Sequence, residues 1–192
     1  MSIKVSSPLD HELGELVTQA QKGDKNAISL LVESVQDEIY RFCYYLARDK
    51  ASAEDLCQET LLRAILNLAK LKEPGRFKAW VLQTGKNIFL DELKRHENKL
   101  RSDGEPPLDE RGTNASAQDT HLQIREALLQ LLPEDRLILI LIDLHEFTYK
   151  EAAEMMKLSE EAVTSRVFRA RKDFVKKFEG NERNHPARSS TS

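Results

Sequence analysis

Hydrophobic residues recur every three to four positions along most of the chain, which is the period of a helix with one buried face. In the first half, this pattern predicts helices over residues 10–22, 26–48, 52–69 and 77–96. Gly23-Asp24 separates the first two helices, and Glu73-Pro74-Gly75 forms a turn before the fourth. Ser52 is the predicted N-cap of the third helix, because Asp55 follows it at the spacing of a capping box.

The second half of the chain carries shorter helical patterns. A helix is expected over residues 121–132, and the apolar run 137–142 that follows would suit a buried strand on propensity alone. Pro133 and the two acids after it are a strong helix start, and no partner strand is predicted, so we favour a buried helix. Thr148 opens a short helix with a capping box, and Ser159 is the predicted N-cap of a last helix over 160–178.

Between the two halves the hydrophobic period disappears. Residues 102–119 are rich in Gly, Pro, Ser and Asn, and hold five acids against one base, Arg111. Such a composition is typical of a flexible linker. The predicted fold class is therefore all-α, with two small helical domains. The expected segments are a disordered leader (1–9), a first domain (10–100), an acidic linker (101–120), a second domain (121–179) and a disordered tail (180–192).

Composition agrees with a helical protein and gives no sign of a cofactor. The 192 residues include only seven glycines and six prolines, which argues against a turn-rich β protein. Cys43 and Cys57 form neither a C-x-x-C pair nor a zinc pattern with histidine, so we predict no disulfide framework, metal or cofactor. The first residues lack an apolar core of signal-peptide length, and the run 137–142 is too short to cross a bilayer. We therefore expect a cytoplasmic protein without membrane insertion.

The most specific motif is TYKEAAEMMKLSEEAVTSRVFRARKDF, at residues 148–174. The helix-turn-helix pattern consists of a capped short helix, a tight turn and a second N-capped helix, and this segment has all three. From Val163 to Lys177 there are six bases and one acid, a net charge of +5 in a chain whose formal net charge is −3. A basic helix alone is often only a solvated surface, but after this pattern it indicates a DNA phosphate footprint.

A second basic segment lies in the first domain. From Arg76 to Arg101 there are seven bases and three acids. Phe77 and Trp80 stand at its start, where aromatic rings beside positive charge can stack on unpaired bases. Both rings also have the spacing of one helix face, and for Trp80 we favour a core position. Asn87 has the chemistry to bond an exposed base edge.

These segments resemble known sequences. Residues 53–71 (AEDLCQETLLRAILNLAKL) and 77–95 (FKAWVLQTGKNIFLDELKR) resemble region 2 of extracytoplasmic-function sigma factors, in the sigma-70 family. Residues 131–172 resemble region 4 of the same family. The resemblance spans roughly residues 10–178, with two motifs in the expected order. It implies a sigma factor that binds core RNA polymerase and directs transcription initiation at specific promoters, in a stress or envelope response, without catalysis of its own.

The resemblance also implies roles for individual residues. Those expected to bind the clamp helices of the β′ subunit are Asp55, Gln58, Glu59 and Arg63. Those expected at the −10 element, where the loop from Ala69 to Arg76 would take up a flipped base, are Leu71, Lys72, Arg76, Phe77, Lys86, Asn87, Lys94 and Arg95. Those expected at the −35 element are Ser159, Thr164, Ser165, Arg166, Arg169, Arg171 and Lys172.

Within the −35 set, the N-terminal part of a recognition helix usually faces the base edges. We therefore expect Thr164, Ser165 and Arg166 to read bases, and Arg169 and Arg171 to contact phosphates. The family usually has Gly-Thr-Val followed by Lys or Arg and Ser-Arg in this helix, whereas residues 161–166 here are EAVTSR. The departure leaves the promoter consensus open.

The expected partners are core RNA polymerase, through its β and β′ subunits, promoter DNA and an anti-sigma factor. Members of this family are often held inactive by an anti-sigma protein that masks both domains, and a flexible linker would permit such an arrangement. One alternative is a helix-turn-helix regulator that works without polymerase, which leaves residues 53–95 unexplained. The other is an enzyme, but the sequence shows no glycine-rich phosphate loop, metal cluster or nucleophile motif.

Overall fold

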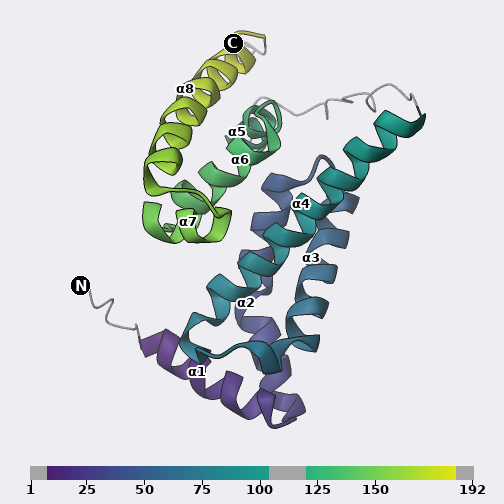
Figure 1. The fold of residues 1–192 in the computed structure, drawn as a ribbon, viewed down its shortest axis with the longest axis vertical. Coiled ribbons are helices and arrows are strands. Elements are labelled where there is room, and N and C mark those ends of the chain that lie inside the picture. Colours follow the sequence, from purple (N-terminus) through teal and green to yellow (C-terminus); the bar gives the residue numbers. More distant parts are fainter. Residues whose placement is uncertain (1–7, 104–119, 185–192) are drawn as a thin grey trace, which may run out of the picture. The chain divides into compact units, whose positions relative to one another are not determined.

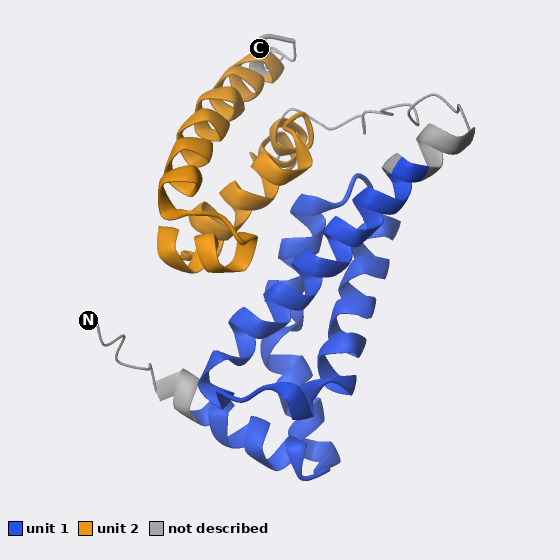
Figure 2. Ribbon diagram, in the orientation of Figure 1, with its two compact units in different colours: residues 1–102 blue, residues 103–192 orange. Residues whose placement is uncertain are grey.

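The computed structural model describes residues 8–103 and 120–184, and the chain divides into two compact units between Ser102 and Asp103 (Figure 2). Unit 1 contains α1 (Pro8–Gln21), α2 (Lys25–Leu46), α3 (Lys50–Leu66) and α4 (Phe77–Asp103) (Figure 1). Two short 3₁₀ turns, η1 (Leu68–Lys70) and η2 (Pro74–Arg76), lie in the connection between α3 and α4.

Unit 2 contains α5 (Thr120–Leu129), α6 (Pro133–Leu139), α7 (Tyr149–Met156) and α8 (Glu160–Asn184). A π-helical turn, η3 (Ile140–Leu144), continues α6. The described residues contain no strand, which confirms the predicted all-α fold class. The apolar run that could have been a strand is helical, and its residues from Leu137 to Leu141 are buried.

The start of α3 differs from the prediction. Asp49, not Ser52, is the N-cap: its Oδ1 accepts a hydrogen bond from the Ser52 backbone N at 2.8 Å. The Ser52 hydroxyl donates to the other oxygen of the same carboxylate, also at 2.8 Å. A carboxylate is a stronger acceptor for the first turn than a hydroxyl, because it also complements the positive end of the helix dipole. The prediction of Ser52 as N-cap was therefore wrong.

Helices α1, α4 and α8 extend into the segments expected to be the leader, the linker and the tail. Helix α1 begins at Pro8, inside the expected leader, and α4 continues to Asp103, inside the expected linker. Helix α8 continues to Asn184, inside the expected tail, where the Gln130 side chain donates to the Asn181 Oδ1 at 3.0 Å. A hydrogen bond between helices at this point is not visible in hydrophobic periodicity. The rest of the leader, linker and tail lies outside the described residues.

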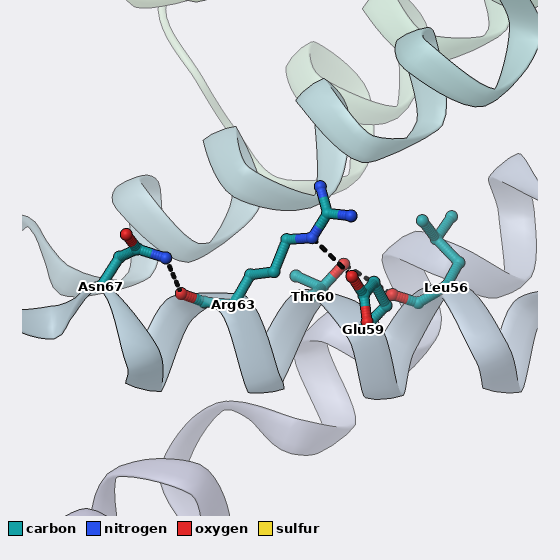
Figure 3. Close-up of polar contacts among 5 residues, drawn as sticks. All are labelled: Leu56, Glu59, Thr60, Arg63 and Asn67. Atoms are coloured by element: carbon teal, nitrogen blue, oxygen red, sulfur yellow. Dashed lines mark hydrogen bonds and ion pairs between the residues drawn. The ribbon is translucent and has the colours of Figure 1, made fainter. Parts of the chain in front are cut away.

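In the core of unit 1, Gly85 allows α4 to pack tightly against α3 and α2. A Cβ atom added at Gly85 would lie 3.1 Å from the Thr60 Oγ1 on α3 and 3.2 Å from the Phe42 Cε1 on α2. Thr60 is fully buried, and its hydroxyl donates to the Leu56 carbonyl at 2.6 Å (Figure 3). The polar atom is therefore satisfied inside the helix, and three helices meet at one point.

Helix α1 holds the connection between α3 and α4. The side-chain amide of Gln21 donates to the Leu68 carbonyl at 3.0 Å and to the Leu71 carbonyl at 2.9 Å. Both hydrogens of the Gln21 amide are thus donated to backbone carbonyls of the loop that follows α3. Helix α1 also packs against η1 and η2. The loop is consequently anchored at its start by a side chain 47 residues earlier in the chain.

In unit 2 a buried arginine closes the end of α5. Arg136 is 5% exposed, and its Nε donates to the Leu128 carbonyl at 3.0 Å. Its Nη2 donates to the carbonyls of Leu129 and Leu131, at 3.0 and 3.3 Å. The Leu128 and Leu129 carbonyls lie in the last turn of α5, and the Leu131 carbonyl lies just beyond it. The Leu128 carbonyl also accepts a hydrogen bond from the Leu131 backbone N at 3.0 Å. Carbonyls at a helix end otherwise lack intrahelical donors. The guanidinium of α6 therefore serves as the C-terminal cap of α5.

We predict that Gly85→Ala destabilises unit 1 by about 1–3 kcal/mol, because the added methyl group must displace Thr60 or Phe42. Trp80 is the only tryptophan in the chain and lies on α4, so its fluorescence during urea unfolding reports on unit 1. Gly75→Ala is the matched control, since its added Cβ meets nothing within 4 Å. Equal stability of the two variants would contradict the close contact.

We also predict that Arg136→Met speeds amide hydrogen exchange throughout α5 and α6 by roughly 30-fold or more. The variant removes the guanidinium donor from three carbonyl groups at the end of α5, at a cost of about 2 kcal/mol or more. The measurement is hydrogen exchange followed by mass spectrometry of peptides from both units. Arg169→Met, which removes an exposed guanidinium, should leave the exchange of α5 unchanged. Protection in α5 that survives Arg136→Met would refute the capping role.

Candidate protein and nucleic-acid interfaces

The four residues predicted to bind polymerase lie along one side of α3. Gln58 and Glu59 lie three and four residues after Asp55, and Arg63 lies four residues after Glu59, so these side chains share one side of the helix. Asp55 and Gln58 are exposed. The Arg63 Nε donates to the Glu59 Oε1 at 2.5 Å, and this pair is on the surface (Figure 3). The structure therefore brings all four predicted residues together.

This face borders an open groove between α3 and α4. The groove is lined by Asp55, Gln58, Glu59 and Leu62 of α3 and by Glu92 of α4. Leu62 and, one turn later, Leu66 are 55% and 73% exposed. Three carboxylates beside exposed leucines suit a basic, amphipathic protein segment. The sequence analysis did not identify these leucines or Glu92 as part of the surface. Two leucines four residues apart on a charged helix face could have indicated a protein-binding site.

The predicted −10 residues divide into an exposed and a buried group. The exposed members are Lys72, Arg76, Asn87, Lys94 and Arg95. Asn87 and Lys94 are seven residues apart and therefore share a face of α4. Gln83, one turn before, donates to the Asn87 Oδ1 at 3.4 Å. This face presents an amide and a positive charge to the surroundings.

The buried members are Leu71, Phe77 and Lys86, which are 8%, 1% and 3% exposed. The structure does not support their predicted contact with DNA. Phe77 begins α4 and its ring lies in the core. This agrees with the alternative interpretation of Phe77 as a core residue. Lys86 follows Gly85, which is itself packed against α2 and α3. Trp80 is half-buried, so it is less enclosed than the favoured core position implied.

Residues 148–174 form the predicted helix-turn-helix. The Thr148 Oγ1 accepts from the Glu151 backbone N at 3.2 Å, and the Thr148 backbone N donates to the Glu151 carboxylate at 2.9 Å, which confirms the capping box. Helix α7 ends at Lys157 in a left-handed conformation (φ 57°). The Ser159 Oγ then accepts from the Ala162 backbone N at 3.2 Å, as expected of the N-cap of α8.

Helix α8 has a buried stripe and an exposed outer face. The buried stripe consists of Val163, Val167 and Ala170. We define the outer face of α8 as the exposed residues on the opposite side, which are Glu161, Ser165, Phe168, Arg169, Lys172 and Lys176. Ser159, at the N-cap, and Thr164, whose hydroxyl donates to the Glu160 carbonyl at 2.8 Å, are also exposed.

Two of the predicted DNA-binding arginines form intramolecular ion pairs. The Arg166 Nη1 lies 2.5 Å from the Glu134 Oε2, and its Nε lies 3.7 Å from the Asp135 Oδ1. Arg171 donates through Nε and Nη2 to both oxygens of Asp143, at 3.2 and 2.5 Å. The bond to Asp143 raises the pKa of the Arg171 guanidinium further. Sequence analysis missed these three acids because the pairs join residues 28 or more positions apart.

The two acids at the start of α6 differ in their surroundings. Burial raises the pKa of the Asp135 carboxyl, and the nearby Arg166 guanidinium offsets part of that rise. Asp135 has 23% of its side chain exposed, against 58% for Glu134. Asp135 is thus the partner that loses more hydration, while Glu134 makes the shorter contact with Arg166.

Residues 8–103 and 120–184 show neither a metal-binding cluster nor a membrane-spanning helix. In these ranges no group of three or more His, Cys, Asp or Glu side chains is placed to hold a metal ion. Cys43 and Cys57 are buried free thiols. Among the helices described there, none has the length and apolar character needed to cross a membrane.

Family models match both units. The model of sigma-70 region 2 matches residues 31–99, and the model of sigma-70 region 4 matches residues 121–174. The chain is 32% identical over 149 residues to the ECF RNA polymerase sigma factor SigM of Bacillus subtilis (strain 168), covering 75% of this chain and 90% of SigM. It is 31% identical over 163 residues to the ECF RNA polymerase sigma factor BldN of Streptomyces coelicolor, covering 81% of this chain but only 62% of BldN.

Two solved structures share the fold. The sigma factor RpoE in complex with the anti-sigma factor NepR, from Bartonella quintana, superposes with a TM-score of 0.65 at 22% identity, over 79% of this chain and 96% of that chain. CnrH in complex with the cytosolic domain of CnrY gives a TM-score of 0.64 at 22% identity, over 88% and 97%. With both region matches in order and SigM matched over most of its length, the chain belongs to the extracytoplasmic-function sigma factors of the sigma-70 family.

Proposed function

We propose that this protein binds core RNA polymerase and directs transcription initiation at specific promoters. The observation that carries the proposal is the order of a region 2 match and a region 4 match on two separately folded units, the second of which holds the helix-turn-helix. Unit 1 would bind polymerase and the −10 element, and unit 2 the −35 element. The polymerase performs the chemistry, and this chain contributes no catalytic residue.

For unit 1 the polymerase-binding surface is the α3 face with its groove. Asp55, Glu59 and Glu92 supply negative charge, while Leu62 and Leu66 supply apolar area. A positively charged helical segment of the β′ subunit would match both properties. Gln58 and Arg63 lie on the same face and would add polar contacts at its rim.

For the −10 element the proposal rests on the loop held by Gln21 and on the exposed face of α4. Opening a duplex costs a few kcal/mol for each unstacked step, and capture of the freed base offsets that cost. Asn87 would bond the edge of an unpaired base, with Lys94, Arg95, Lys72 and Arg76 placed along the strand's phosphates. The two bonds from Gln21 hold the start of this loop through its backbone and do not involve DNA.

For the −35 element the outer face of α8 would enter the major groove. Thr164 and Ser165 lie near the N-terminus of the recognition helix, where base edges are read. Ser159, Arg169 and Lys172 would contact phosphates and fix the register. Arg166 and Arg171 form ion pairs with carboxylates of their own unit, so they are not assigned to phosphates here.

We further propose that the protein works in the cytoplasm, in a stress or envelope response, under an anti-sigma factor. The support is the extracytoplasmic-function family itself, and the fact that the two solved relatives described above are each bound to a second protein, named in one case as an anti-sigma factor. The acidic groove and the apolar Phe168 on α8 are exposed surfaces that such a protein could cover.

The test is run-off transcription from a genomic fragment library, using purified bacterial core polymerase with and without this protein. Transcripts that begin at defined sites only when the protein is present would establish the proposed function and give the promoter motif. DNA binding by the protein without added transcripts would instead indicate a helix-turn-helix regulator that works without polymerase.

A charge-reversal variant tests the polymerase surface. We predict that Asp55→Lys combined with Glu59→Lys weakens binding to core polymerase by about tenfold or more, because two carboxylates of the groove become positive. Affinity is measured by titration of labelled protein with core polymerase in the absence of DNA. Glu33→Lys, an exposed change on α2 outside the groove, is the control. Unaltered affinity of the double variant would remove this surface from the proposal.

A further inference from the structure

Helix α8 forms ion pairs with neighbouring elements on both sides of its buried stripe. Arg166 and Arg171 are five residues apart, which places them about 140° apart around the helix. The buried stripe of Val163, Val167 and Ala170 lies between them. Each arginine reaches from its flank to an acid on a neighbouring element, α6 on one side and η3 on the other. Neither arginine belongs to the outer face that points away from the unit.

The Arg166 flank is the more enclosed. Only 24% of this side chain is exposed, and its guanidinium contacts both acids that open α6. These acids also occupy the positive end of the α6 dipole, where negative charge is favoured. An arginine that turned from them to DNA would deprive Asp135 of its larger cationic neighbour, leaving the smaller influence of Arg169, which is costly for a partly desolvated carboxylate.

The Arg171 flank has the better hydrogen-bond geometry. Two nitrogens of the guanidinium bond the two oxygens of Asp143, which is the bidentate arrangement that gives the strongest arginine–carboxylate pairs. The same nitrogens would be required for a phosphate. The Asp143 carboxylate next to them would moreover repel a phosphate brought to that position.

We propose that Arg166 and Arg171 are positioning residues that, with Glu134, Asp135 and Asp143, fasten both flanks of α8 to the α6–η3 segment and set the angle at which its outer face meets the −35 element. The inference rests on the proposed function and deepens it. The net charge of α8 is then divided into two parts: the outer face provides the charge for DNA, while the two flanking arginines hold the helix.

A charge swap at the Arg171 flank separates positioning from phosphate contact. The variants are Arg171→Glu, Asp143→Arg and the two changes together, each assembled as full-length protein with core polymerase. The readout is the ratio of transcription from a promoter found in the library experiment to transcription from the same promoter with its −35 element scrambled. This ratio depends on the presentation of α8 and is not moved by a small loss of stability well below the unfolding temperature.

Each single change should lower the ratio by about fivefold, because it places like charges face to face. The double variant should recover most of the wild-type ratio, since the pair is rebuilt with the signs exchanged. A phosphate contact by Arg171 predicts the opposite, because the double variant would still present a carboxylate to the DNA. A double variant as defective as Arg171→Glu would therefore overturn the proposal.

The Arg166 flank is tested by sequence preference. If Arg166 positions the helix, Arg166→Gln and Glu134→Gln should each reduce transcription from all −35 variants by a similar factor and leave their rank order unchanged. If Arg166 reads a base, only Arg166→Gln should change the preferred base at one position, and that result would overturn the proposal. Ser165→Ala, on the outer face, is the comparison expected to change the rank order.

The two levels of failure are distinguishable. A wild-type protein that gives no defined start sites with core polymerase removes the proposed function and this inference together. The inference alone fails if the wild-type protein initiates normally and one of two results is found. Either the double swap stays inactive, or Arg166→Gln shifts the preferred base.

Discussion

The close contact of Gly85 with Thr60 and Phe42 is the constraint on which the arrangement of unit 1 depends. A residue without a Cβ lets α4 approach α2 and α3 at this point. The positions of Asn87 and Lys94, and of Glu92 in the groove with α3, are then set within two or three turns of this contact. The proposed −10 face and the proposed polymerase groove are thus two sides of one helix placed by one glycine.

Unit 2 shows why charge counted along a sequence overstates the charge available to a ligand. Helix α8 is strongly basic between Val163 and Lys177, but part of that charge is matched within the unit. Arg166 and Arg171 lie against acids of α6 and η3, while Arg136 of α6 is buried on backbone carbonyls. Arginine is suited to both uses because its rigid fork of donors bonds carboxylates, phosphates and carbonyls with the same geometry.

Sequence patterns identified the helices, the capping box of Thr148 and the family, because each depends on residues close together in the chain or on motifs of fixed spacing. They offered a core position for Phe77 only as an alternative and could not show that Lys86 faces inward, since the inward direction of α4 is decided by its contacts with α2 and α3. They also could not give the partners of Arg166 and Arg171 or the reach of Gln21 to Leu68 and Leu71. Those contacts join residues 28 or more positions apart, and nothing in local periodicity encodes them.

The bonds from Gln21 to Leu68 and Leu71 have an evolutionary consequence. Because the amide bonds main-chain carbonyls, which every amino acid possesses, the anchoring of the start of this loop does not depend on the identity of its exposed side chains. Ala69, Lys72 and Glu73 all point to the surface and are open to substitution at little cost in folding. A lineage of such proteins can therefore diverge in what the loop recognises while the scaffold that presents it stays the same.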